Sequence, residues 1–264
     1  MAQHHAISFK WQGFEPHLLY YDLASKEMLE LDLSSLDIQI SHHSSCVGTW
    51  QGGDYRPCPN EAKVSGGNIC QDCASTFLPE LSCTFEPLCD GELCANRFCQ
   101  QEHAVYLGFH GEIAKVGMTT ARRVEQRVIE QGCDAFSVLA KVDGRASARK
   151  LEGALSENLG LRQRIREIEG LFQMTEEPRP EVMEEKYDTV CVGARGIGLK
   201  PGPLRFLEGY PISMPLDRMP KLANIGGRHR GRVIGKKGKF LIYQNGGLNA
   251  LNLQNMPGRL FTTY

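Results

Sequence analysis

The sequence predicts an α+β fold, in which β-rich segments at both ends flank a zinc-binding, cysteine-rich loop region and a small ββαβα module. Short apolar and polar runs alternate near both ends, cysteines gather in the middle, and strand and helix patterns follow them. A chain of 264 residues is long enough for two or three modules. We expect these segments: 1–45, β-rich; 46–103, zinc-binding; 104–166, the ββαβα module; 167–186, an acidic connector; and 187–264, basic and β-rich.

Composition and charge limit the class of protein. The hydrophobic fraction of 41% and the charged fraction of 23% are ordinary for a globular chain. The N-terminal sequence lacks a basic start followed by an apolar run, and no stretch of about 18 apolar residues occurs. We therefore expect a cytoplasmic protein that does not enter a membrane. In that reducing compartment cysteines bind metal or act in catalysis more often than they form disulfides, so the ten cysteines of the chain favour metal binding over disulfides.

The first segment alternates apolar and polar residues over 6–41, which predicts a small β meander with a structural role. The next segment, from Cys46 to Cys99, is rich in turn-forming residues and has few large apolar ones. Such a segment needs a bound metal to become ordered.

Eight cysteines of this segment form two groups of four. The groups are Cys46, Cys58, Cys70 and Cys73, and Cys83, Cys89, Cys94 and Cys99. Four thiolates complete a tetrahedral zinc site, so the spacing favours two structural zinc ions. Three alternatives stay open: a single zinc ion, a histidine ligand from His42, His43 or His103, and a catalytic cysteine. Cys133 and Cys191 lie outside both groups and are expected in the core.

The third segment contains the patterns of the ββαβα module. Residues 104–117 predict a β-hairpin that turns at Gly111. A helix should follow, capped by Thr119 or Thr120 and ended by Gly132. Residues 135–142 predict a third strand and 147–160 a second helix, with one apolar face formed by Ala148, Leu151, Leu155 and Leu159.

Several residues of this module occur in the same order as in GIY-YIG nucleases, which the module resembles. They are Ala104 to Tyr106, Lys115 to Gly117, Arg123 or Arg127, and Glu152. The resemblance implies that Tyr106 helps to activate water, that Arg127 or Arg123 contacts phosphate, and that Glu152 holds Mg²⁺ or Mn²⁺. Lys115 occupies the position of the second tyrosine. The alternative is a packed tyrosine, surface ion pairs and a solvated glutamate.

Most of the chain also resembles an uncharacterised prokaryotic family, domain of unknown function 2797. The resemblance is carried by Pro57 to Pro59, the pair Cys70 and Cys73, the run from Cys83 to Cys99, His103 to Leu107, Lys115 to Gly117, Arg127 to Gly132, and Gly235 to Gly238. This family implies an architecture but no activity.

The C-terminal segment is basic, since no Asp or Glu follows Arg218. Candidate nucleic-acid-binding residues are Arg228, Arg230, Arg232, Lys236, Lys237 and Lys239, which would bind phosphates without reading bases. A solvated basic rim is the alternative. Residues 235–238 look like the GXXG loop of a KH domain, but strand patterns and the turn at Asn245-Gly246 follow, so a β-turn is favoured.

Two functional hypotheses follow from these patterns. The first is a zinc-binding protein that interacts with nucleic acid, DNA or RNA, and acts as a divalent-metal-dependent phosphodiesterase of GIY-YIG-like type. The second is a non-catalytic adaptor, stabilised by zinc, that binds nucleic acid or protein.

Overall fold

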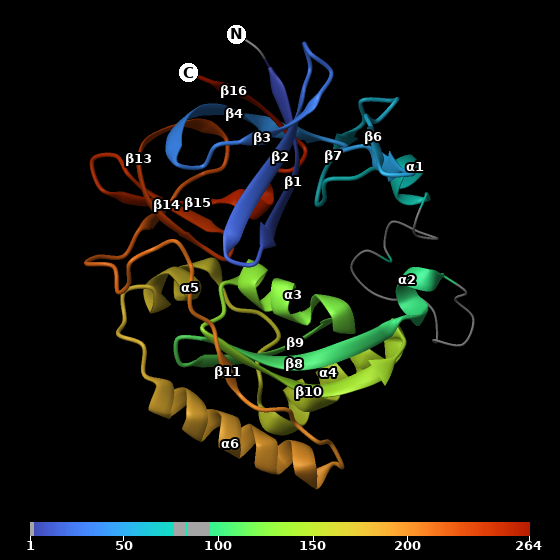
Figure 1. The fold of residues 1–264 in the computed structure, drawn as a ribbon, viewed down its shortest axis with the longest axis vertical. Helices are drawn as coiled ribbons and strands as arrows, with labels where there is room; N and C mark the ends of the chain where they lie inside the picture. Colours follow the sequence, from blue (N-terminus) through green and yellow to red (C-terminus); the bar gives the residue numbers. More distant parts are fainter. Residues whose placement is uncertain (1–2, 77–82, 84–95) are drawn as a thin grey trace. The chain divides into compact units, whose positions relative to one another are not determined.

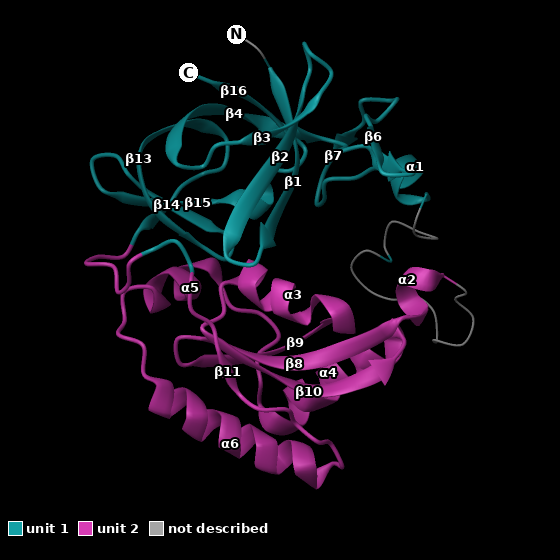
Figure 2. Ribbon diagram, viewed as in Figure 1, with its two compact units in different colours: residues 1–84, 210–212, 220–264 teal, residues 85–209, 213–219 magenta. Residues whose placement is uncertain are grey.

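The computed structural model describes residues 3–76, 83 and 96–264, and its fold is α+β and strand-rich (Figure 1). The chain forms two compact units (Figure 2). The first unit combines residues 1–84 with 210–212 and 220–264, and the second combines 85–209 with 213–219. The β-rich N-terminal segment and most of the β-rich C-terminal segment therefore belong to one structural unit, although they are far apart in sequence.

The first unit is built on a ten-stranded sheet with the order β12-β15-β14-β13-β4-β16-β1-β2-β3, in which β7 also pairs with β4. Its strands are β1 (His4–Gln12), β2 (Glu15–Asp22), β3 (Met28–Leu31), β4 (Ser35–Ser45), β7 (Lys63–Val64), β12 (Lys221–Leu222), β13 (Gly227–Lys237), β14 (Phe240–Gln244), β15 (Leu248–Asn252) and β16 (Arg259–Thr263). The predicted meander is confirmed for β1 to β3, which pair in sequence order. Strand β4 instead lies between β13 and β16.

Apolar residues from both ends of the chain make the core of this unit. Ile38 and Ile40 of β4 pack in one buried cluster with Leu241, Leu251 and Phe261. Burial of such side chains stabilises the sheet by roughly 1.5–3 kcal/mol each. The sheet therefore depends on residues near both ends of the sequence.

The C-terminal hairpins follow the predicted turns. Strands β13 and β14 are joined at Gly238, and β14 and β15 are joined through Asn245 and Gly246. Both glycines have positive φ, of 55° and 65°. Residues 235–237 are part of strand β13, so this segment is not the helix–GXXG–helix of a KH domain.

The second unit contains a four-stranded antiparallel sheet with the order β11-β10-β8-β9. Its elements are α2 (Arg97–Gln100), β8 (Glu102–His110), β9 (Ile113–Thr120), a 3-10 turn (Ala121–Arg123), α3 (Val124–Gln131), β10 (Ala135–Asp143), α4 (Arg145–Leu159), α5 (Glu167–Gln173), α6 (Pro180–Gly196) and β11 (Arg205–Phe206). The predicted order of two strands, helix, strand and helix is present. Gly132 ends α3 in the left-handed conformation, as predicted, and Gly160 ends α4 in the same way.

The stretch 167–186, expected as an acidic connector, differs from that expectation because it is largely helical. Helix α5 and the first part of α6 occupy it, and Leu171 and Met183 are buried among other apolar residues. Pro180 occupies the first turn of α6, where proline is favoured because its missing N–H needs no partner there. Of the glutamates that suggested a linker, those on α6 are exposed and those on α5 are half-buried, while two lie between the helices: Glu181, Glu184 and Glu185; Glu167 and Glu169; and Glu176 and Glu177.

Candidate metal centre

The first cysteine group forms a compact four-sulfur cluster. The Sγ atoms of Cys46, Cys58, Cys70 and Cys73 all lie within 4.8 Å of one another. Those of Cys58 and Cys70 are 3.9 Å apart. Zinc–sulfur bonds of about 2.3 Å place the sulfurs of a tetrahedral site roughly 3.8 Å apart. Four thiols at this spacing, three of them buried, fit a closed zinc site.

Different elements bring the four thiols together. Cys46 follows β4 directly, and Cys58 follows the short hairpin of β5 (Thr49–Gln51) and β6 (Asp54–Arg56). Cys70 precedes the single-turn helix α1 (Gln71–Ala74), and Cys73 lies within it. The C-x-x-C spacing therefore presents two thiols from one helical turn, and the end of the large sheet fixes a third.

Backbone amides point at these sulfurs. The N–H groups of Gly48 and Cys70 donate to Cys46 Sγ at N···S distances of 3.4 and 3.2 Å. Burial would raise the pKa of the Cys58 thiol, but hydrogen bonds from the backbone of Ala62 and Asn60 bring that pKa below its ordinary value. Amide donors of this kind stabilise the negative charge of metal-bound thiolates.

A tight backbone approach holds the loop around Cys46. Gly48 has a φ of 77°, and a Cβ atom there would lie 2.2 Å from the carbonyl oxygen of Arg56. Only glycine fits this position, because both the left-handed conformation and the close carbonyl exclude a side chain.

The second cysteine group is only partly described. Cys83 and Cys99 are buried, whereas Cys89 and Cys94 lie outside the described residues. Among residues 3–76, 83 and 96–264, the four-cysteine cluster is the one group with metal-ligand geometry, and it includes no histidine. His103 Nδ1 instead lies 2.7 Å from the Gln101 carbonyl oxygen. A second zinc ion therefore stays a prediction.

The two cysteines expected in the core are buried there. Cys133 is fully buried and Cys191 nearly so. Cys133 Sγ lies 3.4 Å from His110 Nε2, inside the apolar cluster that also contains Tyr106.

The predicted catalytic tyrosine is enclosed in the second unit. Tyr106 is 1% exposed, and its hydroxyl donates a hydrogen bond of 3.0 Å to Gln131 Oε1. Burial raises its pKa above the ordinary range, and the charge of Glu152 acts in the same direction while that of Arg127 opposes it. Tyr106 is therefore a neutral hydrogen-bond donor, and Arg127 and Glu152 both lie within electrostatic reach of it.

Gly117 makes room for this tyrosine. It pairs directly with Tyr106 across strands β8 and β9, so both residues face the same side of the hairpin. A Cβ atom at position 117 would lie 2.6 Å from the Tyr106 hydroxyl oxygen. The glycine of the sequence motif thus has a steric role in this structure.

Glu152 is one of four buried residues on α4, whereas Leu151, which we expected to be buried beside it, is half-buried. Glu152 follows Ala148 by four residues, which places both on the face of the helix that packs on the sheet. Its carboxylate pairs with the Arg149 guanidinium. Lys115 is also buried, at 7% exposure, on the same face of the hairpin as Gly117.

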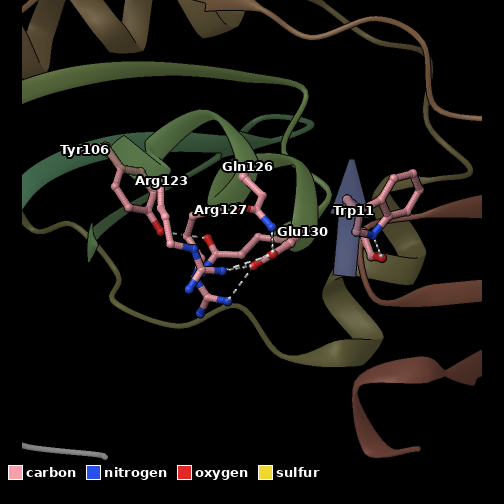
Figure 3. A network of polar contacts seen from close by, with 8 residues as sticks. Trp11, Tyr106, Arg123, Gln126, Arg127 and Glu130 are labelled. Atoms are coloured by element: carbon pink, nitrogen blue, oxygen red, sulfur yellow. Dashed lines mark hydrogen bonds and ion pairs between the residues drawn. The ribbon is translucent and has the colours of Figure 1, made fainter. Parts of the chain in front are cut away.

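Both predicted arginines bind one carboxylate that sequence analysis missed. Glu130 Oε1 accepts from Arg123 Nη2 at 3.2 Å and from Gln126 Nε2 at 2.9 Å, and Arg127 Nη1 lies 3.7 Å from its Oε2 (Figure 3). The spacing of Arg127 and Glu130 along a helix was the available signal. The helix-surface ion pairs considered as an alternative are present here.

The sequence model of the family described as "Protein of unknown function (DUF2797)" matches residues 34–259. The chain belongs to this family. No curated protein and no solved structure matches this DUF2797 chain.

The predicted phosphate-binding residues of this DUF2797 protein divide into two sets. Arg228, Arg230 and Arg232 are exposed and alternate along β13, so they share one face of the sheet. Asp37 of neighbouring β4 pairs with Arg228 at 3.1 Å and with Arg230 at 3.5 Å. Three arginines thus face one carboxylate, and the face, which we call the arginine row, keeps an excess of positive charge.

The lysines of this DUF2797 protein are less available than the sequence suggested. Lys237 is only 3% exposed, and its Nζ lies 5.5 Å from the centre of the Tyr210 ring. Lys236 is half-buried, burial lowers its pKa, and its Nζ donates to the Leu33 carbonyl oxygen. The expectation of a surface set is wrong for Lys237 because the hairpin turns its side chain inward. Lys239 lies with its Nζ 5.3 Å from the Phe240 ring.

Within the described residues, no helix of this DUF2797 chain has the length and apolar content that crossing a bilayer requires.

Proposed function

We propose that this protein holds a structural zinc ion in the four-cysteine cluster and binds nucleic acid through the arginine row of β13. The four sulfurs at tetrahedral spacing support the zinc ion, because closed sets of four thiolates are typical of structural sites. The arginine row carries the binding part of the proposal. Guanidinium groups bind phosphate oxygens through planar forks of N–H donors, which makes arginine suited to such a surface.

The arginine row has the properties of a sequence-independent surface. Its side chains alternate along one strand that is paired on both sides, so contacts to phosphates are expected rather than contacts to bases. Arg228 is fixed by Asp37 and by the Tyr264 ring, 4.2 Å from its guanidinium carbon. Arg230 and Arg232 are the residues best able to reach a ligand.

Replacement of Arg230 and Arg232 together by alanine should weaken binding to single- and double-stranded oligonucleotides alike. Each lost phosphate contact reduces the slope of log affinity against log salt by roughly 0.7 to 0.9, so the pair should reduce it by roughly 1.4 to 1.8. Fluorescence anisotropy over a range of salt concentrations measures both quantities.

The matched control replaces Lys150 of α4 and Lys221 of β12, two exposed lysines on other elements, by alanine. This variant loses the same charge and should keep the wild-type slope. Equal slopes for both double variants would show that binding depends on net charge and not on the arginine row.

A metal-dependent phosphodiesterase is the second candidate function. The charges of Arg127 and Glu152 both act on the pKa of Tyr106, and the three residues lie on β8, α3 and α4 in the order that the GIY-YIG resemblance implies. Glu152 would hold Mg²⁺ or Mn²⁺ together with a substrate phosphate, and Arg127 would bind that phosphate. The burial of Tyr106 and Glu152 favours the non-catalytic adaptor instead, because a substrate phosphate must reach both side chains.

Glu152→Gln separates the two functions. In a working phosphodiesterase it should lower divalent-dependent cleavage by at least about 100-fold while binding is retained, because the amide keeps the shape but cannot hold the cation. Glu157→Gln is the control on the exposed side of the same helix. Gel assays with Mg²⁺ and Mn²⁺ measure cleavage, and circular dichroism checks the fold. A wild-type protein that cleaves neither DNA nor RNA rules out this candidate and leaves the adaptor.

A further inference from the structure

The first unit contains a polar surface pocket of about 540 Å³ that none of the functions above uses. Lys63, Arg259, His42 and His43 line it, together with the loop 65–68. None of the described residues that line the pocket is acidic. Its volume lies within the range of small-molecule sites, roughly 300–1,000 Å³.

The sheet places the two positively charged residues of the lining, Lys63 and Arg259, on opposite sides of strand β4. Ser44, near the end of β4, pairs with Val64 of β7 on one side and with Arg259 of β16 on the other. Lys63 pairs with the next residue of β4, Ser45. Backbone pairing therefore fixes where Lys63 and Arg259 lie beside β4, and both residues line the pocket.

Arg259 is held in place without a carboxylate. Its Nε and Nη1 donate to the carbonyl oxygens of Asn255 and Ser41, both at 2.9 Å. Burial lowers its pKa, which shows that its charge is partly removed from water. In the part of the chain that the structure describes, no ion pair involves Arg259 or Lys63. A partly desolvated cation with only carbonyl partners favours the binding of an anion.

The loop Ser65-Gly66-Gly67-Asn68 adds neutral donors. Gly66 has a φ of 74°, and a Cβ atom built at either glycine would meet nothing within 4 Å, so the backbone there is open to a ligand. The loop is anchored, because Val47 N–H donates to the Asn68 carbonyl oxygen at 2.8 Å. Exposed amides of glycine-rich loops are suited to phosphate oxygens, which accept several hydrogen bonds at once.

We propose that this pocket binds a phosphate group, with Lys63 and Arg259 supplying the charge and the loop 65–68 supplying further donors. The group belongs either to a free nucleotide or to the terminal phosphate of a nucleic-acid strand. No acidic side chain among the described lining residues would attract a cationic ligand, and the polar lining is unsuited to an apolar one. The proposal goes beyond the proposed function, because it holds whether or not the arginine row binds nucleic acid.

The test compares Lys63→Glu with Lys221→Glu, the same charge reversal on an exposed lysine of the same sheet. Isothermal titration uses inorganic pyrophosphate, adenosine monophosphate, and one short oligonucleotide with and without a 5′-phosphate. A charge-assisted hydrogen bond contributes roughly 1.5–3 kcal/mol, so Lys63→Glu should lower the affinity for the phosphate-bearing ligand by about tenfold or more. Lys221→Glu should bind like the wild type.

The arms separate the sources of the phosphate. Binding of pyrophosphate or the mononucleotide that only Lys63→Glu weakens supports a free ligand. Tighter binding of the 5′-phosphorylated strand, with the difference lost only in Lys63→Glu, supports a strand terminus. Absence of binding to all probes, or equal affinities in the two variants, overturns the proposal that the pocket binds phosphate. The double variant of Arg230 and Arg232 should keep the pyrophosphate affinity, so failure of the arginine row is recognised separately.

Discussion

Cys73→Ser is expected to remove the zinc ion of the four-cysteine cluster and to unfold residues 46–76. The hydroxyl of serine is a poor ligand for zinc, and the three remaining thiols of the cluster no longer close the tetrahedron. Structural zinc sites bind with apparent free energies of roughly 10–16 kcal/mol, so this region loses most of what holds it. Few apolar side chains replace the metal, since the buried cluster here consists of Cys46, Cys58 and Cys73 themselves.

Metal analysis and limited proteolysis check this expectation. The variant should contain one zinc ion less per chain than the wild type, and cleavage sites within residues 46–76 should become accessible. Cys191→Ser replaces a buried thiol outside the cluster and should keep the wild-type metal content. Equal zinc content in Cys73→Ser and the wild type would exclude a zinc site at this cluster. A second ion retained by Cys73→Ser would locate it at the other cysteine group.

Gly117→Ala is expected to lower the free energy of unfolding of the second unit by about 3 kcal/mol or more. The added Cβ atom would lie 2.6 Å from the hydroxyl oxygen and 2.7 Å from Cζ of the Tyr106 ring. That ring is enclosed by Val124, Val128 and Cys133, so it cannot rotate away without displacing them. Overpacking of this kind usually costs about 1–3 kcal/mol, and the fixed strand pairing brings the effect to the upper end.

Urea unfolding followed by circular dichroism measures this effect. Gly153→Ala is the matched control, because its Cβ atom would meet nothing within 4 Å on helix α4. Alanine there should stabilise the helix by roughly 0.5–1 kcal/mol. The double variant Tyr106→Ala/Gly117→Ala should lose less free energy of unfolding than the two single variants together, because Tyr106→Ala removes the ring that clashes with the new Cβ atom. An unchanged unfolding midpoint for Gly117→Ala would contradict the tight pairing of β8 and β9.

The elements predicted most closely were those whose signals are local. The order from β8 to α4 follows from hairpin and helix patterns, and Gly132 and Gly160 end both helices as left-handed caps. The first cysteine group was also predictable, because the C-x-x-C pair and two preceding cysteines are close in sequence. In these cases each residue's partners lie within a few turns or one loop of it.

Long-range pairing explains what the sequence could not predict. Arg228 and Asp37 are 191 residues apart, and only the pairing of β13 with β4 brings them together. The hairpin of β13 and β14 buries Lys237, although the residues next to Lys237 in sequence are basic and suggest a surface position. The proposed phosphate pocket could not be predicted from the sequence either, because Lys63 and Arg259 come to line one pocket only through the pairing of their strands with β4.

The central strands of the large sheet are synthesised at two separate times. Strand β4 leaves the exit tunnel early, but both of its neighbours, β13 and β16, are encoded after the whole second unit. Residues 85–209 can complete their own sheet during this interval, while β4 waits with unpaired edges that other chains can recognise. The first unit therefore closes only after both β13 and β16 have been synthesised, and a nascent chain stalled before β13 would expose an aggregation-prone strand.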